Sequence, residues 1–347
     1  MHDLLVVGGG PVGLATALYA VRSGLAVTVR EPRAGIIDKA CGEGLMPGAL
    51  AALRDLGVEV EGRPIDGIRY LDGRHAVDAP FASGPGLGVR RTRLHAALLD
   101  AVHAAGVEVV PRGVRKVEQR DDDVLVDGEP VRHVVAADGL HSPVRRMLGL
   151  DAARSGTRMR RPGLRRYGLR VHVDTAPWTS MVEVHWSPVG EAYVTPVGHD
   201  QVGVALLSAE RRPFEELLDA FPAVRDRLTG HPWSPVLGAG PLRQRSRRRV
   251  EGRVLLVGDA AGYVDALTGE GLALGLAQAR EAVRAVAAGK PTAYESTWRR
   301  LGRTHDLLTL GLVSATRLRP VRRAVVPAAR VAPGVFRAAV NQLARPA

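Results

Sequence analysis

The stretch "DLLVVGGGPVGLATALYAVRSGLAVTVREP", residues 3–32, decides the fold class. It opens with an apolar run at residues 3–7 that ends in glycines, and residues 11–23 then place Leu, Ala and Val at helical spacing. Gly24 ends that helix, and residues 26–30 form a second β-branched run. A strand, a helix and a strand within about thirty residues form the unit that builds a parallel sheet. The stretch therefore predicts an α/β fold.

Three glycines between the first strand and the helix fit the spacing G-x-G-x-x-G: Gly8, Gly10 and Gly13. The first makes the tight turn, the second lets a pyrophosphate approach the backbone, and the third lets helix and strand pack closely. The helix N-terminus then faces the phosphates, and Glu31 can accept hydrogen bonds from ribose hydroxyls. We expect a dinucleotide here, the alternative being a glycine-rich turn without a ligand. The acidic Glu31 argues against the 2′-phosphate of NADP at this position.

A second segment, residues 253–279, "RVLLVGDAAGYVDALTGEGLALGLAQA", distinguishes between dinucleotides. It places Asp259 at the end of an apolar strand, where its carboxylate can accept hydrogen bonds from a ribitol hydroxyl. A helix is expected to open near Gly269 and Gly271, and the partial positive charge of its N-terminus would favour an electron-rich ring edge. The alternative is an ordinary strand, loop and helix. We interpret the segment as part of a flavin site.

The two segments together resemble the FAD-binding elements of the flavoprotein hydroxylase and reductase superfamily. "VVAADGLHSPVRRMLG" resembles its Asp-Gly motif, with Ser142 and Arg145 following, and "RRTRLHAAL" resembles its arginine-x-x-leucine helix start, carried by Arg91 and Leu94. The resemblance covers about residues 1–60, 86–150 and 247–290. It implies FAD as the cofactor, bound by Gly8, Gly10, Pro11, Val12, Gly13, Glu31, Pro32, Arg33, Lys39, Ala40, Cys41, Gly42, Arg91, Asp138, Gly139, Gly258, Asp259, Ala260, Gly269, Glu270, Gly271 and Leu272.

Within that superfamily the chain resembles the geranylgeranyl reductase branch. Gly262 stands where aromatic hydroxylases usually carry histidine, and Ala266 replaces a proline that is common in both groups. "KACGEG", residues 39–44, is similar to the cysteine-glycine loop beside the isoalloxazine ring, and residues 190–206 are similar to the sheet segment that roofs the flavin. The resemblance implies that Thr195 of this segment faces the flavin. It also implies a flavin-side set of candidate catalytic residues: Cys41, Tyr193 and Pro196.

Patterns along the rest of the chain predict how the domains are organised. Between about residues 155 and 245, four runs alternate apolar and polar side chains as antiparallel strands do. We predict a Rossmann-like FAD-binding domain with an inserted antiparallel β-sheet substrate domain and a helical C-terminus. The boundaries are 1–60, 86–150 and 247–295 for the FAD-binding domain, 61–85 and 151–246 for the sheet domain, and 296–347 for the helices.

The formal net charge of +12 does not by itself indicate a nucleic-acid or membrane partner. No nucleic-acid-binding motif accompanies the charge, and nearly all of it is arginine, so we expect no nucleic-acid partner. The arginine runs at 158–166 and 243–249 are either solvated faces or docking sites for an anion, such as a pyrophosphate tail, a carrier protein or the phosphate of NADPH. The basic segment 317–346 could contact a membrane surface, but we favour helices that cover the protein.

The composition also limits which cellular compartment and which metal sites are expected. Cys41 is the only cysteine, which excludes zinc sites built on several thiolates, and we expect no metal. The apolar N-terminal stretch lacks a basic region before it and is interrupted by three glycines and a proline, which disfavours a signal peptide. We expect a cytoplasmic protein.

These observations predict an FAD-dependent oxidoreductase that acts on a hydrophobic small molecule, with NAD(P)H as the transient reductant. We favour an oxygenase of secondary metabolism that works through a flavin C4a-peroxide. The alternative is a flavin-dependent reductase of a carbon–carbon double bond in an isoprenoid or other lipid-like substrate, and a minor one is a non-catalytic flavin-binding protein. A reductase needs a proton donor, for which the candidates are Tyr193, His185, His199 and Cys41.

Overall fold

The computed structural model describes residues 1–152, 165–267, 269 and 271–345. The opening stretch forms β1 (Leu4–Val7), α1 (Pro11–Arg22) and β2 (Val27–Arg30), and the two strands pair in parallel. They belong to a sheet with the order β19-β20-β12-β1-β2-β8. The other strands of this sheet are β8 (Glu108–Val110), β12 (His133–Ala136), β19 (Val250–Glu251) and β20 (Val254–Leu256).

Helices and the short strands within residues 124–131 pack with this mostly parallel sheet in one core, which explains why its central strands are continuous apolar runs. All four residues of β1 are buried, as expected for a central strand with both faces covered. The helix α1 packs against α3 (Arg91–Ala104) and α7 (Gly271–Ala287). Further elements of this half are α2 (Pro47–Asp55), α4 (Pro143–Met147), a 3₁₀ turn η1 (Gly258–Ala260), and the sheet β9 (Val117–Gln119), β10 (Val124–Val126) and β11 (Glu129–Val131).

A second large sheet has the order β17-β13-β16-β15-β14-β5-β6. Its strands are β5 (Gly67–Leu71), β6 (Ala76–Pro80), β13 (Tyr167–Val173), β14 (Met181–Ser187), β15 (Gly190–Pro196), β16 (Val202–Ser208) and β17 (Leu237–Ala239). The predicted antiparallel sheet is present, and one pair of its strands, β14 and β5, runs parallel. They are distant in sequence, and no hairpin turn joins them to fix the antiparallel sense.

Short elements connect the two halves. Segments from both predicted domains form the small sheet β3 (Gly44–Leu45), β7 (Gly86–Gly88) and β4 (Arg63–Ile65). The pair β18 (Gln244–Arg245) and β21 (Gly262–Tyr263) joins the chain leaving the second sheet to the region before α7. The helices α5 (Phe214–Leu218) and α6 (Pro222–Leu228) pack beside the second sheet.

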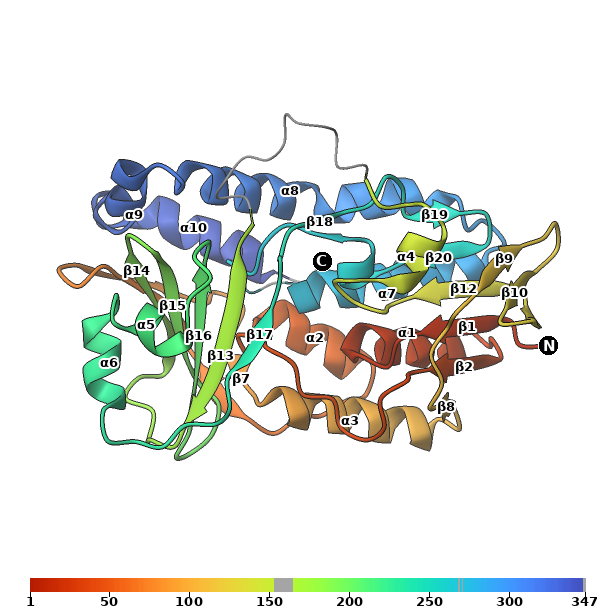
Figure 1. The fold of residues 1–347 in the computed structure, drawn as a ribbon, viewed down its shortest axis with the longest axis horizontal. Helices are drawn as coiled ribbons and strands as arrows, with labels where there is room; N and C mark the ends of the chain where they lie inside the picture. The colour runs from red at the N-terminus through yellow and green to blue at the C-terminus, as the bar shows by residue number, and fades with distance from the viewer. Residues whose placement is uncertain (153–164, 268, 270, 346–347) are drawn as a thin grey trace.

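The C-terminal part is helical and lies along both halves of the molecule (Figure 1). It consists of α8 (Ala293–Ala315), α9 (Arg319–Val331) and α10 (Pro333–Ala344). The helices α9 and α10 pack on β6, and α9 also packs on β14, so the basic segment covers the second sheet. No helix within the described residues combines the length and apolar character that crossing a membrane requires.

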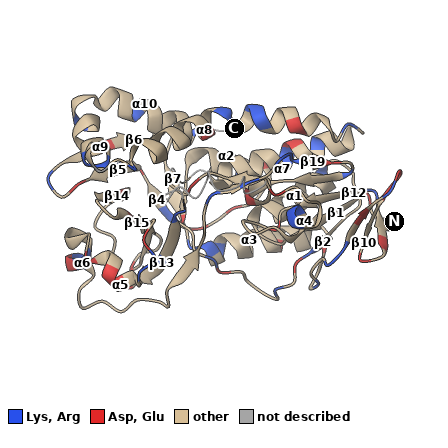
Figure 2. Ribbon diagram, turned by 45° about the horizontal axis from the view of Figure 1, so that its top comes forward, with Lys and Arg blue, Asp and Glu red and all other residues tan. Residues whose placement is uncertain are grey.

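Charged residues are spread over the molecule and do not gather on one element (Figure 2). The predicted arginine run at 158–166 lies outside the described residues except for Arg165 and Arg166. Arg166 is buried and forms ion pairs with the buried carboxylates of Glu191 and Asp265. It is therefore a core residue, and it cannot belong to an exposed docking face.

Candidate functional site

A large cavity lies where the two sheets and the C-terminal helices meet, and its volume is about 720 Å³. Its lining includes the N-terminus of α1, the loop between β2 and β3, and the start of α7. It continues along β5, β14 and β15 to α10. The cavity therefore joins the region with the dinucleotide fingerprint to the predicted substrate region.

The glycine fingerprint leaves no room for side chains. Gly8 has a φ of +106°, and a Cβ on it would lie 2.6 Å from the carbonyl oxygen of Ala137. A Cβ on Gly13 would lie 1.9 Å from the carbonyl oxygen of Gly8, so this glycine allows α1 to pack on β1. Gly10 faces the cavity together with Pro11 and Val12, which exposes the helix N-terminus to a ligand. This is a site for negatively charged phosphates.

Glu31 lies beside this helix N-terminus and lines the cavity with Pro32 and Arg33. Its carboxylate accepts hydrogen bonds from the backbone N–H of Gly9 (2.8 Å) and from the backbone N–H (3.0 Å) and Nε (2.8 Å) of Arg33. Burial alone would raise the pKa of Glu31, but these hydrogen bonds outweigh it and the pKa is lowered. Glu31 is therefore held as a carboxylate.

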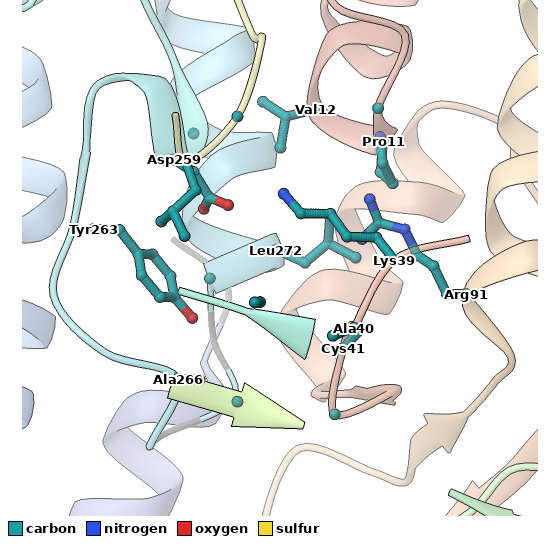
Figure 3. A pocket seen from close by; sticks show the side chains of 18 of the residues that line it. Pro11, Val12, Lys39, Ala40, Cys41, Arg91, Asp259, Tyr263, Ala266 and Leu272 are labelled. Atoms are coloured by element: carbon teal, nitrogen blue, oxygen red, sulfur yellow. The ribbon is translucent and has the colours of Figure 1, made fainter. Parts of the chain in front are cut away.

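The loop between β2 and β3 brings Lys39, Ala40, Cys41 and Gly42 to the cavity. Figure 3 shows that Lys39 reaches into the cavity next to Arg91 of α3. On the far side of the cavity lie Asp259, Tyr263 and Leu272. Gly258, Gly269 and Gly271 also line this side, and α7 begins at Gly271 as the sequence predicts.

Asp138 contributes an acceptor without a partner. It lines the cavity with Gly139, and its Oδ2 accepts a hydrogen bond from the backbone N–H of Val144 (3.0 Å). Its Oδ1 is buried and has no hydrogen-bond partner among the described residues. Burial raises the pKa of Asp138. A buried acceptor without a partner carries a free-energy cost that a ligand hydroxyl or N–H can remove.

Arg145, which follows the Asp-Gly motif, supports the site from behind. It is fully buried, and its Nε pairs with Asp151 (2.6 Å). Its remaining guanidinium nitrogens donate to the carbonyl oxygens of Ala260 (3.0 Å) and Leu140 (3.1 Å). Arg145 therefore ties the loop after β12 to the loop after β20.

Several predicted site residues do not line the cavity. Gly13 and Ala260 lie behind it, and Glu270 lies outside the described residues. Pro196 is buried but absent from the lining, because side chains alternate along β15 and only Tyr193 and Thr195 point inward.

The structure also shows which of the predicted proton donors line the cavity and which do not. His185 pairs with Glu183 (3.0 Å) away from the cavity, and His199 is exposed beside Asp200. Tyr193 lines the cavity, and burial raises its pKa well above the usual value. Its hydroxyl donates to the carbonyl oxygen of Leu267 (2.7 Å), so its proton is already engaged.

A buried network that sequence analysis missed holds the Cys41 loop. Glu43, with a φ of +59°, accepts a hydrogen bond from Nε2 of His172 on β13 (2.6 Å) and from the backbone N–H of Arg91 (2.7 Å). Arg170 donates to Nδ1 of His172 (2.9 Å) and pairs with Asp38 at the start of the loop. Because arginine has no acceptor, Nδ1 of His172 must accept, and Nε2 therefore carries the proton.

Sequence analysis also missed the apolar end of the cavity. Ile68, Tyr70, Val182, Val184 and Leu207 line this end from the second sheet, and Val340 and Leu343 line it from α10. Tyr263 was missed as well, although it lies next to the predicted Asp259. Burial raises its pKa well above the usual value, and its hydroxyl has no hydrogen-bond partner in the described chain.

The polar half of the cavity fits FAD. It offers a helix N-terminus for the pyrophosphate, an acid held ionised at the end of β2, and the unpartnered acceptor of Asp138. A family described as "FAD binding domain" matches residues 1–188, more than half of the chain. The chain belongs to the FAD-binding-domain flavoproteins. The prediction of FAD and the α/β fold class are thereby confirmed.

Two curated relatives place this flavoprotein near the geranylgeranyl reductase branch, as the sequence predicts. Menaquinone reductase of Mycobacterium tuberculosis is 32% identical over 317 residues, which cover 80% of this chain and 74% of the relative. Digeranylgeranylglycerophospholipid reductase 1 of Methanothermobacter thermautotrophicus is 28% identical over 328 residues, covering 86% and 80% of the two chains.

The fold of this flavoprotein is shared more widely than its sequence. A flavin-dependent brominase has a TM-score of 0.79 with it at 15% identity, and the match covers 99% of this chain and 93% of the brominase. At that identity the likeness describes the fold alone.

Proposed function

We propose that this flavoprotein is a reductase of a carbon–carbon double bond in a hydrophobic, isoprenoid-type substrate. The observation that carries the proposal is the continuity of one cavity from the FAD elements, past the Cys41 loop, to an apolar end. The names of the two curated relatives supply the class of reaction, since both are reductases of molecules with hydrophobic chains. This was the alternative interpretation of the sequence, and it is now better supported than oxygenation.

The two ends of the cavity have different tasks. Bound FAD supplies hydride transfer when it is reduced, and the polar end holds it. The apolar end gives an isoprenoid chain surface to bury at about 25 cal/mol per Å². The loop of Lys39, Ala40, Cys41 and Gly42 lies between the two ends, and we propose that Cys41 packs where substrate meets flavin.

Reduction of an alkene also needs a proton, and we propose that Tyr263 supplies it. Its high pKa keeps the hydroxyl protonated. The hydroxyl of Tyr193 donates its proton to a backbone carbonyl oxygen, whereas the hydroxyl of Tyr263 donates to none in the described chain. Tyr263 and Cys41 both line this cavity. NAD(P)H remains our proposed source of electrons.

The experiment uses FAD-loaded protein reduced with dithionite under nitrogen, so that no nicotinamide site is needed. Menaquinone and digeranylgeranylglycerophospholipid are offered separately after excess dithionite is removed. Menaquinone products are reoxidised to the quinone, and mass spectrometry then follows the two hydrogens gained by the isoprenoid chain. We expect single-turnover reduction of at least one, and a fall of roughly 100-fold in rate for Tyr263→Phe. Tyr167→Phe, at a tyrosine outside the cavity lining, is the matched control.

Oxygenation remains the competing outcome. The same reduced protein is mixed with ¹⁸O₂ and each substrate. Incorporation of ¹⁸O into the product, together with no anaerobic reduction, would overturn the proposed reductase. FAD that NAD(P)H and dithionite reduce without any change in substrate would instead indicate a non-catalytic flavin-binding protein.

A further inference from the structure

A second, smaller cavity of about 200 Å³ lies between residues 243–249 and the helices α7 and α8. We call it the arginine cavity, because Arg243, Arg245 and Arg249 line it. Its volume is below the roughly 300–1,000 Å³ of a pocket that takes a whole ligand. It is therefore suited to a small group, or to one end of a larger molecule.

The arginine cavity adjoins the flavin cavity. Gly258, Asp259, Tyr263 and Gly271 line both, so the start of α7 and the loop after β20 form a shared wall. A group bound in the arginine cavity would therefore lie directly behind the residues that face FAD.

Two of the arginines have no carboxylate partner within residues 1–152, 165–267, 269 and 271–345. Neither Arg243 nor Arg245 makes an ion pair with a carboxylate in the described part of the chain. The pKa of Arg243 is lowered by burial and by the nearby positive charges of Arg245 and Arg317. Arg243 is partly buried and Arg245 is exposed, so an anion that joins them would relieve the repulsion at the less hydrated Arg243.

Two further donors in the lining have no acceptor. Arg249 stacks on the ring of Trp298, with its guanidinium carbon 3.6 Å from the ring centroid. The Nε of Arg249 and the Nε1 of Trp298 are both buried without a hydrogen-bond partner among the described residues. Trp298 is only 8% exposed, so water does not readily satisfy its N–H.

Carboxylates also face the arginine cavity, but those in the described residues do not neutralise the positive charges of Arg243 and Arg245. Asp259 and Asp306 line the cavity, and Asp306 lies 3.5 Å from Nδ1 of His305. Glu295 lies outside the lining and is 3.7 Å from Arg249. Asp306 and Glu295 both offset the charge of Arg249, which leaves Arg243 and Arg245 as the excess.

We propose that the arginine cavity binds a phosphoryl group. Guanidinium groups match the geometry of phosphate oxygens and can bind them through two parallel hydrogen bonds. The indole N–H of Trp298 and Nε of Arg249 add donors that no group in the described part of the chain uses. The phosphoryl group can come from three sources: the 2′-phosphate of NADPH, a diphosphate on the substrate, or free phosphate. The site is independent of the proposed reductase activity.

The test measures inorganic phosphate binding to the FAD-loaded full chain by isothermal titration in chloride-free buffer. We expect one saturable site, and a Kd at least tenfold higher in the variant Arg243→Gln/Arg245→Gln. Trp298→Phe keeps the stacked ring and removes only the N–H, so it should weaken binding several-fold. Flavin absorbance checks that each variant retains FAD and is folded.

Arg247→Gln is the matched control, because Arg247 lies in the same segment, is exposed and does not line the cavity. Equal weakening by Arg247→Gln, unchanged binding in the double variant, or no saturable binding to the native protein would each overturn the proposal. Competition then identifies the source. Phosphate that competes with NADPH but not NADH indicates the 2′-phosphate, competition with a prenyl diphosphate indicates the substrate, and competition with neither indicates free phosphate.

Discussion

At the scale of single residues, two acids of the cavity show how local donors decide charge. Glu31 and Asp138 both lie at the carboxyl ends of parallel strands and both are affected by burial. Glu31 accepts hydrogen bonds from Gly9 and Arg33, and its pKa is lowered. One oxygen of Asp138 has no partner in the described chain, and its pKa is raised. Local donors therefore move the pKa values of these two acids in opposite directions.

Glu31→Gln tests this difference through its pH dependence. A lowered pKa in the folded state means that Glu31 stabilises the protein above its ordinary pKa of 4.5, and that this contribution is lost as pH falls through the folded-state value. We expect Glu31→Gln to lower the free energy of unfolding by about 1–3 kcal/mol at neutral pH. The difference from the native protein should shrink below about pH 4.

Urea unfolding at several pH values measures the effect, with Glu59→Gln as the control because Glu59 is exposed. The explanation fails if the two variants have the same stability at neutral pH. It also fails if the loss in Glu31→Gln is independent of pH.

At the scale of elements, the sequence predicts structure formed by residues that are close in the chain. It does not predict contacts between residues that are far apart in the chain. The β1–α1–β2 unit and the start of α7 follow from spacing and glycines within each segment. The parallel pairing of β14 with β5 depends on residues far apart in the chain, and no local pattern encodes it. The same is true of Glu43 and His172, which meet only because β13 lies beside the Cys41 loop.

The orientation of the Cys41 loop should depend on that distant contact. We expect His172→Ala to destabilise the protein by about 1–3 kcal/mol, because it leaves the buried carboxylate of Glu43 with one donor fewer. It should also weaken FAD binding and substrate reduction several-fold, since the loop lines the cavity. Thermal unfolding, flavin titration and turnover measure the three effects.

His185→Ala is the matched control for this prediction. His185 forms the same kind of pair with Glu183 on β14, but neither residue lines the cavity. We expect it to lower stability without changing FAD affinity or turnover. If both variants affect flavin and substrate equally, the Glu43–His172 contact has only a structural role.

At the scale of the whole molecule, the cavity is assembled from parts that the sequence shows only separately. The glycine motifs predict its polar end, but the apolar end combines β5, β14 and β15 with α10. Val340 and Leu343 belong to the last helix, yet they line the same space as the N-terminus of α1. Helical periodicity near the C-terminus indicates a buried face without indicating what it faces.

Because α10 lines the apolar end, its side chains should set the length of substrate that fits. Leu343→Phe adds volume there, and we expect a shift toward shorter prenyl chains, with at most about 1–3 kcal/mol of destabilisation. Leu343→Ala should give the opposite shift. The measurement compares reduction rates across substrates that differ only in their number of isoprene units. FAD binding should not change, since the flavin elements lie at the other end of the cavity.

Ala338→Phe places the same ring on an exposed position of α10 and should leave the chain-length profile unaltered. An identical profile for Leu343→Phe and Ala338→Phe would mean that the substrate chain does not reach α10.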